Sequence, residues 1–62
     1  MLKLLVVEDH ALVREGLVRL LAQVDQEVEV AEAADFETAL TQLEDAGEYD
    51  LVFLDLALPG ID

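Results

Sequence analysis

The 62-residue chain has no cysteine, no tryptophan, a single proline and three basic side chains. Without cysteine, no disulfide or thiolate metal site can stabilise it, and nothing indicates an oxidising compartment. A chain this short buries only about 60% of the surface of its unfolded form. Its 55% apolar content nevertheless predicts a dense core rather than disorder. That content also predicts that part of the apolar surface is covered by other residues or by another molecule.

Basic residues are absent from residues 25–62. All three lie in the first 24 positions, where they balance three acids, so the other twelve of the fifteen acids lie in residues 25–62. The net charge of −12 repels nucleic acid and anionic membranes. We therefore expect no direct nucleic-acid or membrane contact from this segment, and a preference for cations and basic partners.

Long apolar runs are also missing. The opening MLKLLVV is ended by Glu8 and Asp9 before a signal-peptide core or a membrane span is complete. We interpret residues 2–7 as a buried strand and expect the protein in the cytoplasm.

The remaining patterns alternate between strand and helix. Residues 2–7 and 51–54 are apolar runs typical of strands in a parallel sheet, and residues 28–31 alternate around Glu29 like a half-exposed strand. Residues 11–24 have helical periodicity, begin after Asp9 or His10, and carry an apolar face of Val13, Leu17, Leu20, Leu21 and Val24.

A second helix is predicted after Asp35, a good N-cap, and ends at Ala46–Gly47. Its apolar face consists of Phe36, Ala39, Leu40 and Leu43. The order strand, helix, strand, helix, strand predicts an α/β fold with a parallel sheet covered by helices.

Three acids stand at predicted strand ends: Glu8 and Asp9 after the first strand and Asp55 after the third. Ligands of open parallel sheets bind at the carboxyl ends of the strands. If the first and third strands are neighbours, these ends lie about 4.8 Å apart and the three carboxylates share one pocket. Like charges so close require a cation, and Mg²⁺ prefers such oxygen ligands. The pocket would also suit phosphoryl transfer to a carboxylate, although solvated strand-end acids remain the alternative.

The segments LLVVEDHALVREGL and DLVFLDLALPGID resemble the receiver domains of two-component signalling, and EDHALVREGL resembles the NarL/FixJ/LuxR-type branch. The resemblance covers all 62 residues. It implies the flavodoxin-like fold of the chemotaxis receiver, β-α-β-α-β with parallel strands in the order 2-1-3 and an open edge at the third strand.

The resemblance also implies site roles. Asp55 matches the residue phosphorylated by a partner histidine kinase, and Asp9 matches the direct Mg²⁺ ligand. Glu8 matches a companion acid that is often Asp, and the backbone carbonyl of Ala57 matches the third protein ligand. Pro59 and Gly60 match the turn beside the site, while Leu58 stands where Met is frequent, a change in packing rather than chemistry. Such a receiver is a phosphoacceptor and not an enzyme.

Receivers of this type are roughly twice as long. The resemblance therefore implies that residues 1–62 are a truncated receiver domain. The fourth strand, which ends in Thr or Ser in the family, the fifth strand, which ends in Lys, and any output domain would be absent. The sole lysine, Lys3, is six residues before Asp9, about 20 Å along a strand. The chain has no serine, and Thr38 and Thr41 fall on the second helix. We expect the segment to be switch-incompetent alone and its parent to be a DNA-binding transcriptional regulator.

Other side chains have simpler interpretations. His10 is expected to face solvent, although it could be a ligand or phosphate relay. Arg14 and Arg19 are expected on the solvated face of the first helix, with kinase docking as the alternative. Phe36 and Tyr49 are interpreted as packing residues.

Two other enzyme or binding classes fit poorly. A haloacid-dehalogenase-type phosphatase needs a second acid two residues after its nucleophile, where Ala57 stands. Nucleotide binding lacks a glycine-rich phosphate loop, because the first turn reads EDHA. The remaining alternative is a self-associating half-domain, a homodimer formed through the exposed third-strand side.

Overall fold

Three parallel strands form one sheet in the order β2-β1-β3 in the computed structural model, which describes residues 2–24, 26–46 and 48–55. The predicted architecture is thereby confirmed. The elements are β1 (Leu2–Val7), α1 (Ala11–Leu21), β2 (Val28–Ala33), α2 (Phe36–Ala46) and β3 (Leu51–Leu54).

Two element boundaries differ from those predicted. Helix α1 ends at Leu21 rather than residue 24, because the amides of Gln23 and Val24 donate to the carbonyls three residues before them, at 3.1 Å each. Such bonds tighten a last turn and end a helix. Strand β2 extends to Ala33, two residues beyond the prediction, since Glu32 and Ala33 still pair with the end of β1.

Strand β1 lies at the centre of the sheet and supplies most of the core. Its last four residues, Leu4 to Val7, are at most 2% exposed. Leu5 and Val7 point to one face, where they cluster with Ala33 and Ala39. Alternation along the strand directs Leu4 and Val6 to the other face.

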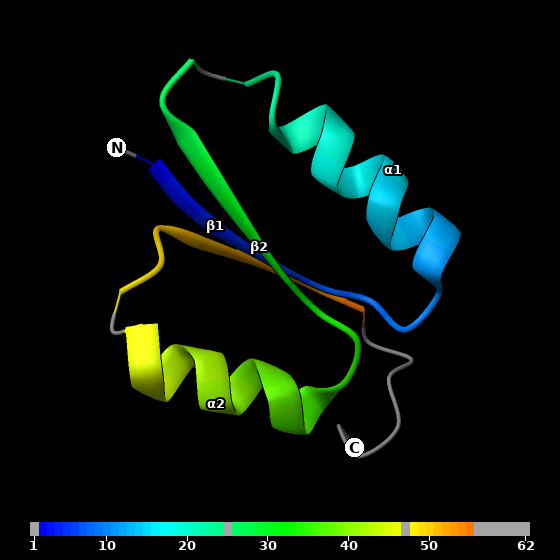
Figure 1. The fold of residues 1–62 in the computed structure, drawn as a ribbon, viewed down its shortest axis with the longest axis vertical. Helices are drawn as coiled ribbons and strands as arrows, with labels where there is room; N and C mark the ends of the chain where they lie inside the picture. Colours follow the sequence, from blue (N-terminus) through cyan, green and yellow to red (C-terminus); the bar gives the residue numbers. More distant parts are fainter. Residues whose placement is uncertain (1, 25, 47, 56–62) are drawn as a thin grey trace.

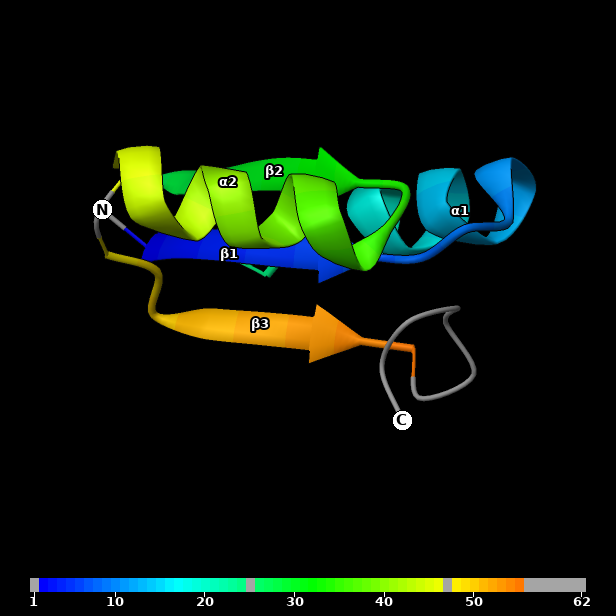
Figure 2. The same ribbon diagram turned by 90° about the horizontal axis from the view of Figure 1, so that it is seen from below.

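The two helices lie on opposite faces of the sheet (Figure 1). Both contact β1 and β2, and within the described ranges neither contacts β3. Figure 2 shows β3 at the edge of the sheet, beside β1 and away from α2. The side chains of Leu51 to Leu54 are consequently 37–51% exposed.

The half-buried face of α1 is only partly the predicted one: Leu17 and Leu21 lie on it as predicted. Val13, Leu20 and Val24 are 51%, 65% and 64% exposed, so their assignment to the apolar face was wrong. The half-buried side chains of this helix are Arg14, Leu17, Val18 and Leu21. The predicted stripe and the observed one share Leu17 and Leu21 but differ in their other residues. In the structure, the stripe that contains Arg14 and Val18 faces the sheet.

Helix α2 begins as predicted. The amide of Thr38 donates to Oδ1 of Asp35 at 2.7 Å, which satisfies one of the unpaired donors at the helix start. Ala39 is buried, and Phe36 and Leu43 are half-buried, as expected for the apolar face, whereas Leu40 is 42% exposed. In the described part of the chain, no helix is long and apolar enough to cross a membrane.

Candidate metal site at the carboxyl end of the sheet

The parallel pairing of β1 and β3 brings the predicted acids to one rim of the sheet. Val7 is in register with Leu54, and the amide of Asp55 donates to the carbonyl of Val7 at 3.1 Å. Glu8 and Asp9 therefore follow β1 at the point where Asp55 follows β3. The predicted convergence of acids from two separate strands is confirmed.

Four side chains meet there: Glu8, Asp9, His10 and Asp55. One potential ligand atom from each lies within 4.8 Å of those of the other three. Opposite ligands of one octahedral Mg²⁺ ion are about 4.2 Å apart, because each lies about 2.1 Å from the ion. Sub-ångström adjustments would therefore place the carboxylates around a single divalent cation.

Glu8 is the buried member of this cluster, with only 7% of its surface exposed. Its amide donates to the carbonyl of Ala33 at 3.0 Å, which extends the pairing of β1 with β2. Its Oε2 accepts a hydrogen bond from the amide of His10 at 2.9 Å. A buried carboxylate needs a hydrogen-bond donor, and the amide of His10 supplies one to the Glu8 side chain.

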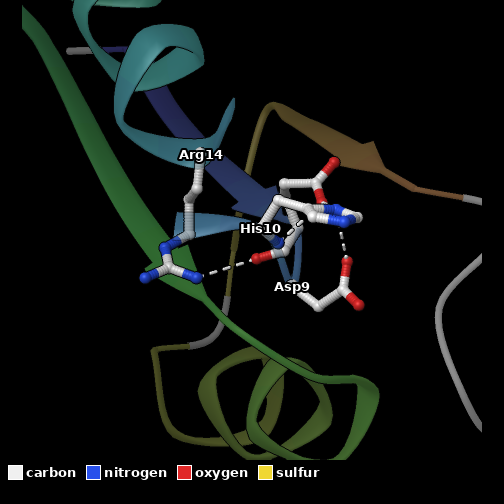
Figure 3. A network of polar contacts seen from close by, with 4 residues as sticks. Asp9, His10 and Arg14 are labelled. Atoms are coloured by element: carbon white, nitrogen blue, oxygen red, sulfur yellow. Dashed lines mark hydrogen bonds and ion pairs between the residues drawn. The ribbon is translucent and has the colours of Figure 1, made fainter. Parts of the chain in front are cut away.

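His10 lies against both neighbouring acids. Its Nδ1 is 3.0 Å from Oε2 of Glu8 and 3.2 Å from Oδ1 of Asp9 (Figure 3). The hydrogen bond with Glu8, the negative charge of Asp9 and the further charges of Glu8 and Asp55 raise the pKa of His10. The ring is 74% exposed, which confirms the predicted solvent-facing position. Its contact with both acids was not predicted, although its position directly after the acid pair was the available signal.

Arg14 belongs to the support of the site rather than to a solvated helix face. Its Nη1 donates to the carbonyl of Glu8 at 2.9 Å (Figure 3). Its Nε donates to Oε1 of Glu32 at 3.1 Å. Its side chain is 21% exposed, so the prediction of a solvated Arg14 was wrong. Partial burial of Arg14 is possible because Glu32 on β2 is its counter-ion. Local sequence patterns do not show this contact, because the two residues lie on different elements. Arg19 is 76% exposed beside Glu15, as predicted.

A hollow of about 160 Å³ adjoins the cluster. Its walls combine the apolar ends of the strands, one side chain of α1 and two of the acids. They comprise Val7, Glu8, Leu17, Phe53, Leu54 and Asp55.

Lys3 lies at the opposite end of β1. Its Nζ is 5.3 Å from the centre of the Tyr49 ring, and its amide donates to Oδ2 of Asp50 at 2.7 Å. Tyr49 is half-buried and packs against the core, as predicted. Lys3 therefore pairs with residues at the start of β3 and not with the acids at its end.

The predicted carbonyl ligand of Ala57, together with Leu58, Pro59 and Gly60, lies outside the described residues. Chemically, the described cluster offers three carboxylates and one imidazole. The three carboxylates fit a hard divalent cation such as Mg²⁺, and the strand-end position of Asp55 leaves its carboxylate at the rim of the hollow.

Comparison with known families gives one match over most of the chain. Residues 4–62 match the response regulator receiver domain. No solved structure matches significantly.

Similar proteins come from several bacteria. The chain is 41% identical to the response regulator GacA of Pseudomonas syringae over 98% of its length, and 42% identical to the sensory transduction protein LytT of Bacillus subtilis over 97%. It is 36% identical to a glycerol metabolism activator of Pseudomonas putida over 98% of its length. These matches cover 28%, 24% and 28% of the respective relatives, so the chain spans about a quarter of their length.

Proposed function

This chain belongs to the response regulator receiver domain family, and from that premise we propose that Asp55 accepts a phosphoryl group from a partner histidine kinase. The observation that supports this proposal is the meeting of Asp55 with Glu8 and Asp9 at one rim of the sheet. An isolated strand-end Asp would have no partner acids with which to hold a cation. Here the neighbouring strand β1 is followed by two such acids, Glu8 and Asp9.

In the proposed transfer, a carboxylate oxygen of Asp55 attacks the phosphorus of a phosphohistidine. The oxygen–phosphorus bond forms, the phosphorus–nitrogen bond breaks, and the released imidazole keeps the electron pair and takes up a proton. The product is an aspartyl phosphate, so the chain acts as an acceptor and not as an enzyme with turnover.

Glu8, Asp9 and Asp55 would hold the Mg²⁺ ion, and we propose the carbonyl of Ala57 as a further ligand. When bound, the ion offsets the repulsion between the acceptor carboxylate and the phosphoryl oxygens. Arg14 holds the carbonyl of Glu8 and thereby fixes the loop that carries Asp9. The net charge of −12 favours cation binding at this rim.

We further propose that residues 1–62 are the first half of a longer receiver, in a cytoplasmic response regulator with a DNA-binding output domain. The NarL/FixJ/LuxR-type branch stays a prediction based on EDHALVREGL, since the names of the relatives do not specify it. The lysine and the hydroxyl residue of the complete switch would come from later strands. Lys3 is bound at the other end of β1, so the segment alone is expected to be switch-incompetent.

The test is phosphorylation by acetyl phosphate and Mg²⁺, followed by intact mass spectrometry. The longer parent protein should gain one phosphoryl group on Asp55, whereas the 62-residue segment should react slowly or not at all. Asp55→Asn should abolish the gain, and Asp50→Asn, an acid at the opposite end of β3, should not. Labelling that persists in the Asp55→Asn parent would refute the assignment.

A second proposal concerns self-association of the 62-residue segment through β3. The four residues of this strand are apolar and 37–51% exposed, and within the described ranges the backbone of neither helix lies close to this strand. An uncovered apolar edge strand is a template for pairing with another strand. We propose a two-fold homodimer in which the β3 strands of two copies pair antiparallel and extend the sheet.

Charge opposes this dimer. Two copies each carry a net charge of −12, and antiparallel pairing brings Asp50 of one copy toward Asp55 of the other. Added salt should therefore strengthen the association by screening. Sedimentation at micromolar concentration should show a dimer that Phe53→Lys converts to monomer and that Leu12→Lys, on the exposed face of α1, leaves intact. A well-folded wild-type monomer under these conditions would contradict the proposal.

A further inference from the structure

We propose that His10 is a fourth metal ligand and makes this rim select borderline transition-metal ions, such as Ni²⁺ or Zn²⁺, over Mg²⁺. The inference depends on the proposed function in one respect: the carboxylates must hold a divalent cation. It goes further because it assigns the imidazole to the ion's coordination and names the class of metal that competes for the phosphorylation site.

The first support is the spacing of the ligand atoms. Nδ1 of His10 is 3.0 Å from Oε2 of Glu8 and 3.2 Å from Oδ1 of Asp9. Two ligands each about 2.1 Å from one ion are about 3 Å apart when they subtend a right angle. The nitrogen and the two oxygens thus have the separations of adjacent ligands on a single ion. Asp55 contributes its ligand atom within 4.8 Å of all three.

The second support is the fixed position of the His10 backbone. Its amide donates to Oε2 of Glu8 at 2.9 Å, and its carbonyl accepts from the amide of Arg14 at 2.8 Å. These bonds tie the residue to the end of β1 on one side and to the first turn of α1 on the other. The backbone of His10 is therefore fixed beside the carboxylates, and from this position the ring nitrogen already lies 3.0 and 3.2 Å from their oxygens.

The choice of metal follows from ligand chemistry. Mg²⁺ prefers oxygen ligands and gains little from an imidazole, whereas Zn²⁺, Ni²⁺ and Cu²⁺ bind imidazole well. A nitrogen ligand added to three carboxylates therefore raises the affinity for transition metals far more than for Mg²⁺. A transition-metal ion bound in this way would occupy the rim from which Asp55 must react.

The competing interpretation makes His10 an internal counter-ion. A charged ring hydrogen-bonded to Glu8 and Asp9 would occupy the place of the cation and would weaken the binding of every metal. Removal of the ring then raises all affinities together. The two interpretations predict opposite effects on Ni²⁺ affinity, so one substitution distinguishes them.

The experiment is calorimetric titration of the 62-residue chain with Ni²⁺ and, separately, with Mg²⁺, with circular dichroism to verify that each variant is folded. His10→Gln should weaken Ni²⁺ binding at least about tenfold, because even indirect contacts of a metal site are worth that much, and should change Mg²⁺ binding less than about twofold. Asp9→Asn should weaken both metals, and Asp45→Asn, an exposed acid on α2, should affect neither. Unchanged or tighter Ni²⁺ binding in His10→Gln would overturn the inference.

A second readout is the ring itself. His10 is the single histidine of the chain, so its imidazole nitrogen signals are unambiguous in NMR spectra. Zn²⁺ should shift the Nδ1 resonance strongly, and Mg²⁺ should not; a Zn²⁺ shift confined to Nε2, or none, would refute the geometry. Failure of the proposed function appears differently, as normal His10-dependent Ni²⁺ binding with no phosphorylation of Asp55 in the parent protein.

Discussion

Strands β1 and β3 lie side by side and have the same sequence pattern, an apolar run that ends in acid, yet their surroundings differ. The last four residues of β1 are buried, whereas all four of β3 are partly exposed. The cause is tertiary: both helices pack on β1 and β2. The candidate site spans this boundary, because Glu8 and Asp9 follow the buried strand and Asp55 follows the exposed one.

The largest expected effect comes from a matched pair of substitutions across this boundary. Leu5 is fully buried and in register with Val52, which is 39% exposed. Leu5→Ala should lower the free energy of unfolding by about 2–5 kcal/mol, whereas Val52→Ala should cost less than about 1 kcal/mol. Since a chain of this length has roughly 3–9 kcal/mol of stability, Leu5→Ala alone could unfold it.

Urea denaturation followed by circular dichroism would measure both values. Equal costs for the two substitutions would show that β3 is as well packed as β1. A cost for Val52→Ala that grows with protein concentration would instead show that a second copy covers β3.

The next effect concerns Arg14, which contacts the residues after β1. Arg14→Gln removes the donor to the Glu8 carbonyl and the ion pair with Glu32, and should cost about 1–3 kcal/mol because one partner is left in a part-buried place. Arg19→Gln is the control, because Arg19 is 76% exposed and should matter by less than about 0.5 kcal/mol. Thermal unfolding would compare the two, and equal effects would contradict the structural role of Arg14.

A smaller effect is expected at the start of β3. Asp50→Ala removes the acceptor of the Lys3 amide, an exposed hydrogen bond at 2.7 Å, and should cost about 0.5–1.5 kcal/mol. The Lys3 amide should then exchange its hydrogen faster, while the amide of Glu8 at the other end of β1 keeps its rate. Hydrogen exchange measured by NMR would separate the two ends, and unchanged exchange at Lys3 would show that this bond does not anchor β3.

The smallest effect is a pH dependence far from the site. Asp35 accepts hydrogen bonds from Thr38, chiefly from its backbone amide and also from its hydroxyl. These bonds lower the pKa of Asp35 below the ordinary value of 3.8. The ionised Asp35 therefore stabilises the folded state at pH values above 3.8. This contribution is lost as the pH falls through the lower pKa that Asp35 has in the folded state. Asp35→Asn retains the N-cap and should flatten this part of the acid unfolding curve. An identical curve for both proteins would contradict the assignment.

The sequence predicted the order of elements and the meeting of Asp9 and Asp55, because parallel strands place their carboxyl ends at one edge. It also predicted the cap at Asp35, a local interaction. The buried face of α1 was predicted only at Leu17 and Leu21. Two overlapping stripes satisfy the same period, and the ion pair between Arg14 and Glu32 distinguishes them only in three dimensions. The contacts of His10 likewise depend on how the chain turns after Glu8.

The position of Asp55 directly after β3 has a consequence for any strand that pairs with this edge of the sheet. The side of β3 away from β1 presents backbone amides and carbonyls that another strand can satisfy, and such a strand would lie about 4.8 Å away. Parallel addition would bring its last residue next to Asp55, the proposed phosphoacceptor. Backbone pairing alone would thus place the last side chain of an added strand beside the carboxylate of Asp55, without any contact between side chains.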